Sequence, residues 1–311
     1  MTYRISGHES FTLRYTWLPK VVHHVARDSR LLAKEEEAMV HFGVGKNMVR
    51  SIRFWAQAAG IIVGNGKDGG YQLTKLANVL LGENGLDPFL EDTRTLWLIH
   101  WNLATNIQNP LLAWDYLLNF WHEPEITPTV VTKALQKEAH KEQGRLSPVT
   151  LIQHFECFLH TYVPTRGRKG QIQEDNLDCP LVELNFIVKV GERDSDQPSG
   201  RREAIYAFNR EEKSDITPDL FLYCLNSFWR ERHPTEGTLS FREVAHGHGS
   251  PGQVFKLPEE DVRMRLDGLN RLPGSSFTYT ESSNLEQVQR AGFQNDLTLL
   301  KRIYKANGRN H

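Results

Sequence analysis

The sequence predicts a mainly helical α+β protein in which short β-hairpins follow amphipathic helices. Apolar residues recur at helical spacing through most of the chain, glycine-rich loops separate short strand-like segments, and proline, serine or aspartate stands at several helix starts. With 39% hydrophobic residues in 311, the chain can bury the cores of roughly two or three compact units. We expect domains over residues 1–86, 87–214 and 215–311.

The most regular pattern lies between Lys34 and Leu81. Gly43 and Gly45 separate two helical segments by a tight turn, since glycine reaches backbone angles that other residues avoid. A glycine-rich loop over 64–70 lies between two strand-like runs and predicts a hairpin. The expected elements are helices over 34–42, 46–59 and 75–81 and strands over 61–63 and 71–73. Helix, turn, helix and hairpin in this order predict a winged helix-turn-helix.

The polar arc of helix 46–59 points to nucleic acid. Apart from Phe54, it carries cations and an amide with no carboxylate on the helix: Lys46, Asn47, Arg50 and Arg53. A recognition helix in the major groove presents such donors to phosphates and base edges. We therefore expect contact with double-stranded DNA rather than a merely solvated face, provided that internal ion pairs do not hold these guanidinium groups. Lys67, in the hairpin loop, is expected to reach a phosphate or the minor groove, and a role in protein interaction stays open.

The middle of the chain is rich in aromatic residues. Asp92 is a suitable N-cap for a helix over 93–104, and a second aromatic helix is expected over 111–121. Closely spaced tryptophans of this kind can stack on nucleic acid bases. At helical spacing they more often form a core, so we expect an aromatic helical core that joins the modules.

A second module resembling the first is expected after Thr127. Pro128 begins a helix that runs to about residue 143, and Ser147 with Pro148 begins another that ends near Tyr162. The β-rich segments 180–190 and 203–208 then suggest a larger hairpin. The loops around these strands contain basic residues that could contact phosphates. They are Arg166, Arg168, Lys169, Arg201 and Arg202.

The carboxyl-terminal third repeats this order more weakly. The expected elements are helices over 218–232, 241–245 and 259–269, a glycine loop over 246–252 and a strand over 277–279. The basic tail from Lys301 to Arg309 either contacts nucleic acid or is a solvated end.

Composition limits the function classes. A net charge of −1 removes any global electrostatic argument for nucleic acid, so such an argument must come from local patches. No apolar stretch approaches the roughly 20 residues of a membrane span, and we expect no membrane partner. Cys157, Cys179 and Cys224 are odd in number and far apart, which disfavours a disulfide framework or a zinc ribbon and suits the cytoplasm.

Five blocks of sequence, in order, resemble a bacterial family catalogued as a domain of unknown function, DUF4007, and represented by SspB-like proteins of DNA phosphorothioation systems. The blocks are SGHESFTLRY (6–15), GVGKNMVR (43–50), LEDT with LWL (90–98), LDCPLVEL (177–184) and SPGQVFKL (250–257). Together they extend over nearly the whole chain.

The resemblance implies a part in placing sulfur in the DNA backbone for self-marking and phage defence. It also implies partners: a cysteine desulfurase, an adenylating sulfurtransferase and an ATPase. Nicking of DNA, which would open one strand to the sulfur chemistry, is the implied activity. A non-catalytic reader that recruits this machinery and a winged-helix transcription regulator are the alternatives, and self-association into a homo-oligomer is left open.

The residues offer no specific nuclease motif. Most nucleases use Mg²⁺ held by two or more carboxylates, and the nearest set here is Asp175, Asp178 and Glu183. Asp178 and Glu183, the latter on an expected strand, are our catalytic and metal-binding candidates. The plainer interpretation, which we favour, is that Asp178 organises a turn and Glu183 lies on a sheet face.

A second polar group lies near the amino terminus. His8 is a candidate base oriented by Glu9, with Arg14 on a phosphate. A hydrogen-bonded tether of the terminus to the core is the favoured alternative. His246 and His248 lack an evident third ligand, so no metal is expected there. The segment Gly43–Asn47 lacks the spacing of a phosphate-binding loop and is not expected to bind a nucleotide.

Overall fold

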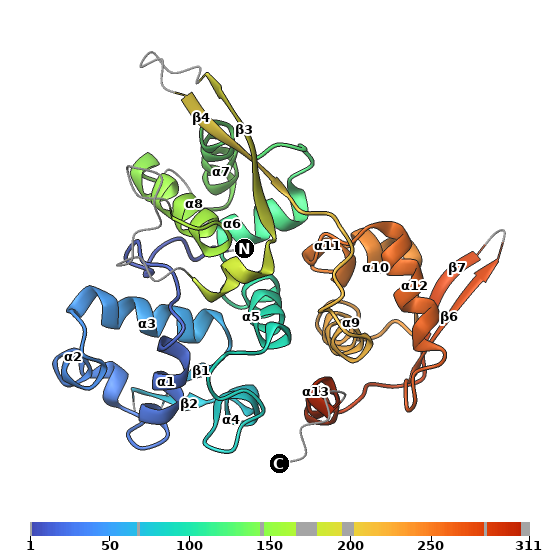
Figure 1. Cartoon of the computed structure of the whole chain (residues 1–311), viewed down its shortest axis with the longest axis horizontal. Coiled ribbons are helices and arrows are strands. Elements are labelled where there is room, and N and C mark those ends of the chain that lie inside the picture. Colours follow the sequence, from blue (N-terminus) through green and yellow to red (C-terminus); the bar gives the residue numbers. More distant parts are fainter. Residues whose placement is uncertain are drawn as a thin grey trace. The chain divides into compact units, whose positions relative to one another are not determined.

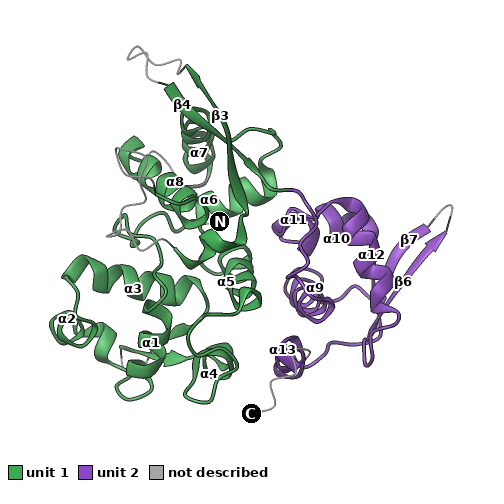
Figure 2. Cartoon of the chain, viewed as in Figure 1, with its two compact units in different colours: residues 1–209 green, residues 210–311 purple. Residues whose placement is uncertain are grey.

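The computed structural model of the chain describes residues 2–66, 69–143, 146–165, 179–194, 202–282 and 285–305. The fold is α+β, with many helices and small antiparallel sheets (Figure 1). It divides into two compact units, residues 1–209 and 210–311 (Figure 2). The three-part division expected from the sequence stays a prediction. Among the helices of the described ranges, none has the length and apolar character that crossing a membrane requires.

After α1 (Trp17–Val25), which was not predicted, unit 1 contains the elements expected from the glycine pattern. They are α2 (Glu35–Phe42), α3 (Lys46–Ala58), β1 (Ile62–Asn65), β2 (Gly70–Leu73) and α4 (Lys75–Leu81). Gly43 ends α2 at φ +67°, in the left-handed region that glycine tolerates. Thr74 caps α4 because its hydroxyl accepts a hydrogen bond from the Ala77 amide at 3.1 Å. Local sequence therefore predicted these boundaries to within one or two residues.

The middle of unit 1 is a buried aromatic core, as expected. It contains α5 (Thr93–Thr105), α6 (Leu112–Asp115), a π-helical turn (Tyr116–Phe120), α7 (Pro128–Gln143) and α8 (Pro148–Tyr162). Asp92 caps α5 by accepting from the Arg94 amide at 2.9 Å. The indole of Trp114 donates to the Tyr162 hydroxyl at 2.9 Å inside this core. Trp97 and Trp101 are also fully buried, so they are not available to stack on bases.

Unit 1 ends in the antiparallel hairpin of β3 (Ile187–Asp194) and β4 (Arg202–Phe208). The expectation of β-rich structure from residue 180 was wrong, because Pro180–Leu184 forms a 3₁₀ helix. Pro180 has the fixed φ and missing N–H that suit a helix start, and Asn185 ends the turn at φ +45°. Ile126 pairs antiparallel with Tyr206 on β4, next to the start of α7.

The elements of unit 2 are α9 (Pro218–Arg232), β5 (Thr238–Ser240), α10 (Phe241–His246), α11 (Pro251–Val254), α12 (Glu259–Leu269), β6 (Phe277–Ser282), β7 (Leu285–Arg290) and α13 (Asp296–Lys305). The strands form an antiparallel sheet of order β5-β7-β6. Gly252 lets α11 approach α10, since a Cβ atom there would lie 2.4 Å from the Ala245 carbonyl oxygen. The expected helix over 259–269 is confirmed.

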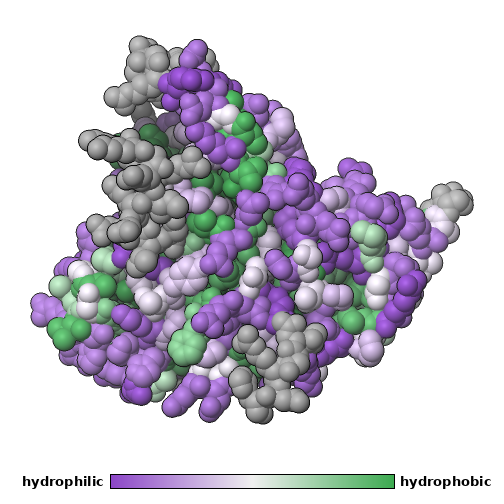
Figure 3. Space-filling model, viewed as in Figure 1, coloured by the Kyte–Doolittle hydropathy of each residue, from purple (hydrophilic) through white to green (hydrophobic). Residues whose placement is uncertain are grey.

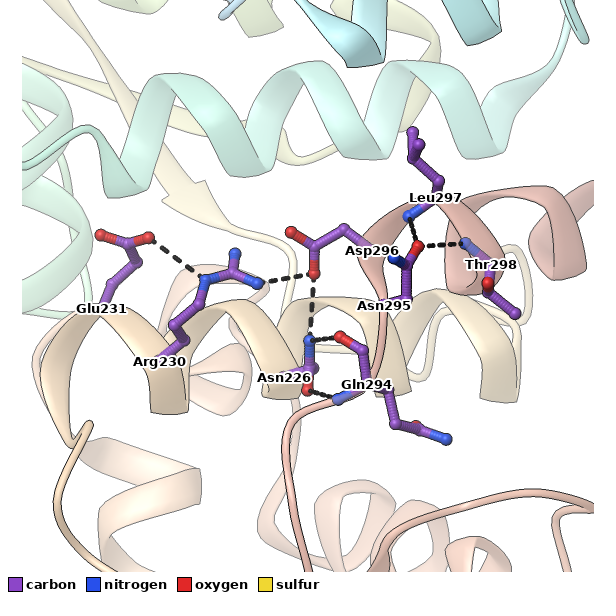
Figure 4. Close-up of polar contacts among 8 residues, drawn as sticks. All are labelled: Asn226, Arg230, Glu231, Gln294, Asn295, Asp296, Leu297 and Thr298. Carbon is purple, nitrogen blue, oxygen red and sulfur yellow. Dashed lines mark hydrogen bonds and ion pairs between the residues drawn. The ribbon is translucent and has the colours of Figure 1, made fainter.

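A polar network holds α13 on α9 (Figure 4). The amide of Asn226 donates to Asp296 at 3.1 Å and to the Gln294 carbonyl at 3.1 Å, and Arg230 pairs with Asp296 at 2.7 Å. Asn295 caps α13 by accepting from the amide of Leu297 at 3.0 Å. These bonds connect α9 to α13 and cap α13, so the network stabilises the packing of the two helices.

Candidate nucleic-acid interface

The outward side of α3 carries the side chains expected from the sequence. Val49, Ile52 and Trp55 on its inner side are completely buried. The side facing solvent is formed at Lys46 and Asn47, which are exposed, and at Arg50 and Arg53, which are half-buried. The tight turn at Gly43 precedes α3, and the hairpin of β1 and β2 follows it.

Two of these cations have a carboxylate partner on another helix. Arg50 Nε lies 2.8 Å from Glu35 Oε1, and Lys46 Nζ lies 3.1 Å from Glu35 Oε2. Hydrogen bonds from Arg50 and Lys46 lower the pKa of Glu35 to about 2. The side chains of Lys46 and Arg50 are 57% and 38% exposed, so the pairs lie at the surface and are screened by salt. The row is therefore partly neutralised, contrary to the expectation of unpaired guanidinium groups.

Arg53 and Arg4 make a different set of contacts. Arg53 Nη1 donates to the Leu32 carbonyl at 3.3 Å. The Arg4 guanidinium carbon lies 4.2 Å from the centre of the Phe54 ring. Phe54, expected among the polar residues of α3, is only 1% exposed because Arg4 and His8 of the amino-terminal segment cover it. Nothing in the sequence places Arg4 here, since the two residues are distant in the chain.

The hairpin is anchored to the segment that follows α1. The Tyr71 amide donates to the Ser29 carbonyl at 2.7 Å, and a Cβ atom on Gly70 would lie 2.8 Å from the same oxygen. Gly70 therefore permits a close approach that fixes the base of the hairpin. Lys67, expected to contact DNA, lies outside the described residues.

His8 and Glu9 do not form a hydrogen-bonded pair in the described structure. His8 is buried, its Nε2 lies 3.4 Å from His154 Nδ1, and its Nδ1 accepts from the Ser10 amide at 3.1 Å. Burial lowers the pKa of His8 to about 4 and that of His154 to about 3. Glu9 is exposed, and its charge contributes to the raised pKa of Arg50. The geometry fits the tether, and catalytic roles for His8 and Glu9 stay predictions.

Glu183 lies on the 3₁₀ helix rather than on a strand, which corrects the sequence expectation. The Tyr15 hydroxyl donates to its carboxylate. Burial, followed by the bond to Glu183, raises the pKa of Tyr15. Asp175 and Asp178 lie outside the described residues, and within those residues no three His, Cys, Asp or Glu side chains form a group that could hold a metal ion. A magnesium site at Asp178 and Glu183 thus stays a prediction.

The second basic region is only partly described. Arg202 on β4 is 66% exposed and lies 3.8 Å from Glu192. Arg166, Arg168, Lys169 and Arg201 lie outside the described residues. A phosphate contact in this region stays a prediction.

In unit 2 the helix before the hairpin has the opposite charge. Glu259, Glu260 and Asp267 of α12 are exposed. Arg265 points inward and pairs with buried Asp261 at 2.9 Å. The surface over α12 and the hairpin β6–β7 is mostly hydrophilic (Figure 3). This face therefore presents carboxylates rather than hydrogen-bond donors that could bind phosphate.

Comparison with known proteins agrees with the fold. A solved structure described as "Magnesium ion-bound SspB crystal structure" matches with a TM-score of 0.83 and 23% identity, covering 97% of this chain and 90% of that one. A second, "SspB crystal structure", matches with a TM-score of 0.82 and 23% identity, covering 96% and 87%. No curated protein matches the sequence. Residues 5–304 match the profile of the family described as "Protein of unknown function (DUF4007)", and the chain therefore belongs to the DUF4007 family, as its sequence blocks indicated.

Proposed function

We propose that the protein binds double-stranded DNA through α3 and the hairpin β1–β2, which with α1 and α2 form a winged helix-turn-helix. The observation that supports this most is the row of donors on the outward side of α3: Lys46, Asn47, Arg50 and Arg53. Cations neutralise phosphates, and amide and guanidinium groups also read base edges in the major groove.

We further propose that this binding serves DNA phosphorothioation in phage defence. The support is the resemblance of the five sequence blocks to SspB-like proteins, together with a fold shared with two SspB structures. A cysteine desulfurase, a sulfurtransferase and an ATPase would then be the partners that supply and insert sulfur. The protein would present the DNA strand on which they act.

A more specific proposal is that the protein nicks one strand of the DNA. It would need Mg²⁺ held by Asp178 and Glu183, but the described residues provide only Glu183 of this pair, and Tyr15 already donates to its carboxylate. We therefore derive no cleavage step from this site. Incubation of supercoiled plasmid with Mg²⁺, using wild type, Asp178→Ala and Glu183→Ala, tests it. Loss of nicking in both variants supports the carboxylate pair. Unchanged nicking in either variant excludes the substituted residue from the nicking site.

The binding proposal is tested by fluorescence anisotropy with duplex DNA over a range of salt concentrations. We expect Arg50→Ala with Arg53→Ala to abolish specific binding and to flatten the dependence of affinity on salt. Arg271→Ala in unit 2, at an exposed ion pair with Asp267, is the control and should bind as wild type does. Equal binding by all three proteins would contradict the proposed face. A transcription regulator, in contrast, would bind one palindromic site and would not cleave DNA with any metal ion.

A further inference from the structure

The cations around α3 fall into two groups according to their carboxylate partners. Lys46 and Arg50 share Glu35, and Glu9 adds to the negative charge around Arg50. Arg53 and Arg4, by contrast, have no acidic partner in the part of the chain that the structure describes. The positive charge of this surface is therefore compensated at one end of α3 and uncompensated toward the other.

Arg4 and Arg53 are held in place by contacts that leave their charges unneutralised. Arg4 stacks on Phe54, and its backbone amide donates to the Pro110 carbonyl at 2.8 Å. Arg53 is fixed by α3 and by its bond to the Leu32 carbonyl. Stacking and backbone bonds immobilise a guanidinium group but leave further N–H donors for a ligand. Both side chains are half-buried, so ordering them on binding has a smaller entropic cost than for free surface arginines.

The two guanidinium groups also act on one another. Burial and the charge of Arg53 lower the pKa of Arg4, whereas Tyr71 on β2 acts to raise it. The geometry agrees with this, because Arg4 stacks on Phe54, the residue that follows Arg53 in α3. Two like charges held near each other are stabilised by an anion that binds both.

We propose that Arg4 and Arg53 form a phosphate-binding subsite that clamps one backbone phosphate of DNA beside α3 and the hairpin. The inference rests on the proposed DNA binding and names the contact that matters most within it. Guanidinium groups bind phosphate through paired N–H donors, a geometry that lysine does not supply. Lys46 and Arg50 contribute less than the subsite because a phosphate must displace Glu35 to reach them.

Salt-dependent binding of the full chain to duplex DNA tests the subsite. We expect Arg4→Gln and Arg53→Gln each to lower affinity about tenfold and to reduce the slope of log affinity against log salt by about one. The double variant should lose about the same slope as either single variant, because both residues bind one phosphate. Arg53→Lys should retain the slope and still lose affinity. Lys46→Gln should lose less than half as much slope, and Lys20→Gln, an exposed control on α1, should match wild type.

A second measurement separates the subsite from DNA binding. In ¹⁵N-labelled protein, inorganic phosphate at constant ionic strength should shift the Nε–Hε signals of Arg4 and Arg53. These signals are assigned by their disappearance in Arg4→Lys and Arg53→Lys, variants that keep the positive charge. DNA binding with wild-type slopes in both glutamine variants would overturn the subsite and leave the proposed function standing. Signals that shift with phosphate in a protein that does not bind DNA would overturn the proposed function and leave a phosphate site standing. Unshifted arginine signals, or a larger slope loss in Lys46→Gln than in Arg53→Gln, would also overturn the subsite.

Discussion

The helices α3 in unit 1 and α12 in unit 2 each precede an antiparallel hairpin, yet they present opposite charges to solvent. On α3 the arginines lie on the outward side. On α12 Arg265 points inward, donating to Asp261 at 2.9 Å and to the Lys213 carbonyl at 2.8 Å, while Arg263 stacks 4.4 Å over Phe241. Similar element order therefore places arginine on the outward side of the helix in one unit, where we propose that it binds DNA, and in the framework of the fold in the other.

This difference shows that element order alone does not identify a DNA-binding helix. Duplex DNA carries one negative charge per about 1.7 Å, so a helix that exposes Glu259, Glu260 and Asp267 is repelled by it. The direction of the charged side chains, which depends on tertiary contacts, decides the partner. We therefore expect α3, and not α12, to carry DNA binding.

The largest effect should come from charge reversal on α3. Arg50→Glu with Arg53→Glu should weaken duplex DNA binding at least 100-fold, about 3 kcal/mol, because attraction becomes repulsion. Glu259→Gln with Glu260→Gln on α12 should change affinity less than twofold in the same anisotropy assay. Thermal unfolding of both variants checks that the fold is retained. Comparable losses from the two helices would erase the distinction between them.

The units should also differ in their response to acid. In unit 1 the folded-state pKa values of His8 and His154 lie below the unfolded value of 6.5, at about 4 and about 3. The unfolded chain thus binds protons that the folded chain does not, and stability falls as pH decreases from 6.5 toward 4, by up to about 1.4 kcal/mol per pH unit for each imidazole. Urea unfolding at pH 7 and pH 5, followed by tryptophan fluorescence, measures this, and Trp114 contributes with its ring 5.9 Å from His154.

Variants assign that loss to the buried pair. His154→Gln should reduce the pH dependence of unfolding, although its stability at pH 7 is expected to be lower. His233→Gln in unit 2, at a half-buried pair with Glu243, should retain the wild-type dependence. If His154→Gln and wild type lose equal stability between pH 7 and pH 5, the buried pair is not the source.

Much of unit 1 was predictable because its signals are local. Gly43, Thr74 and Asp92 mark helix ends through their own backbone or side-chain chemistry, and the polar side of α3 follows from helical periodicity. The 3₁₀ helix at Pro180–Leu184 was not predicted, since Val182 and Leu184 suit a strand and the competing effect is the turn at Asn185.

The contacts of the candidate interface were not predictable in the same way. Helical periodicity assumes one packed side, but the amino-terminal segment covers a second side of α3 at Phe54. Glu35 and Arg50 lie on different helices, so their ion pair depends on how α2 packs against α3. Which cations are free and which are neutralised is thus a tertiary property, invisible in a count of charges on one helix.

In unit 2 the polar network of Figure 4 should affect stability without affecting DNA binding. Asn226→Ala removes donors to Asp296 and the Gln294 carbonyl and the acceptor of the Gln294 amide, so we expect a loss of about 1–3 kcal/mol in the free energy of unfolding. Arg271→Gln, at an exposed pair, should cost less than about 1 kcal/mol. A large loss of DNA affinity in Asn226→Ala at temperatures where the fold is intact would implicate unit 2 in binding.

The smallest effect should come from Glu35 of α2, the carboxylate that pairs with Lys46 and Arg50 of α3. Glu35→Gln frees Lys46 and Arg50 from their surface ion pairs, which are worth about 0–1 kcal/mol each, so duplex DNA affinity should rise two- to fivefold and its salt dependence should steepen. Glu36→Gln, the exposed neighbour on α2, is the matched control for charge and should produce a smaller rise without changing the slope as much. A fall in affinity in Glu35→Gln would instead mean that Glu35 positions Arg50 for the phosphate, because the guanidinium group would then bind DNA only while the carboxylate orients it.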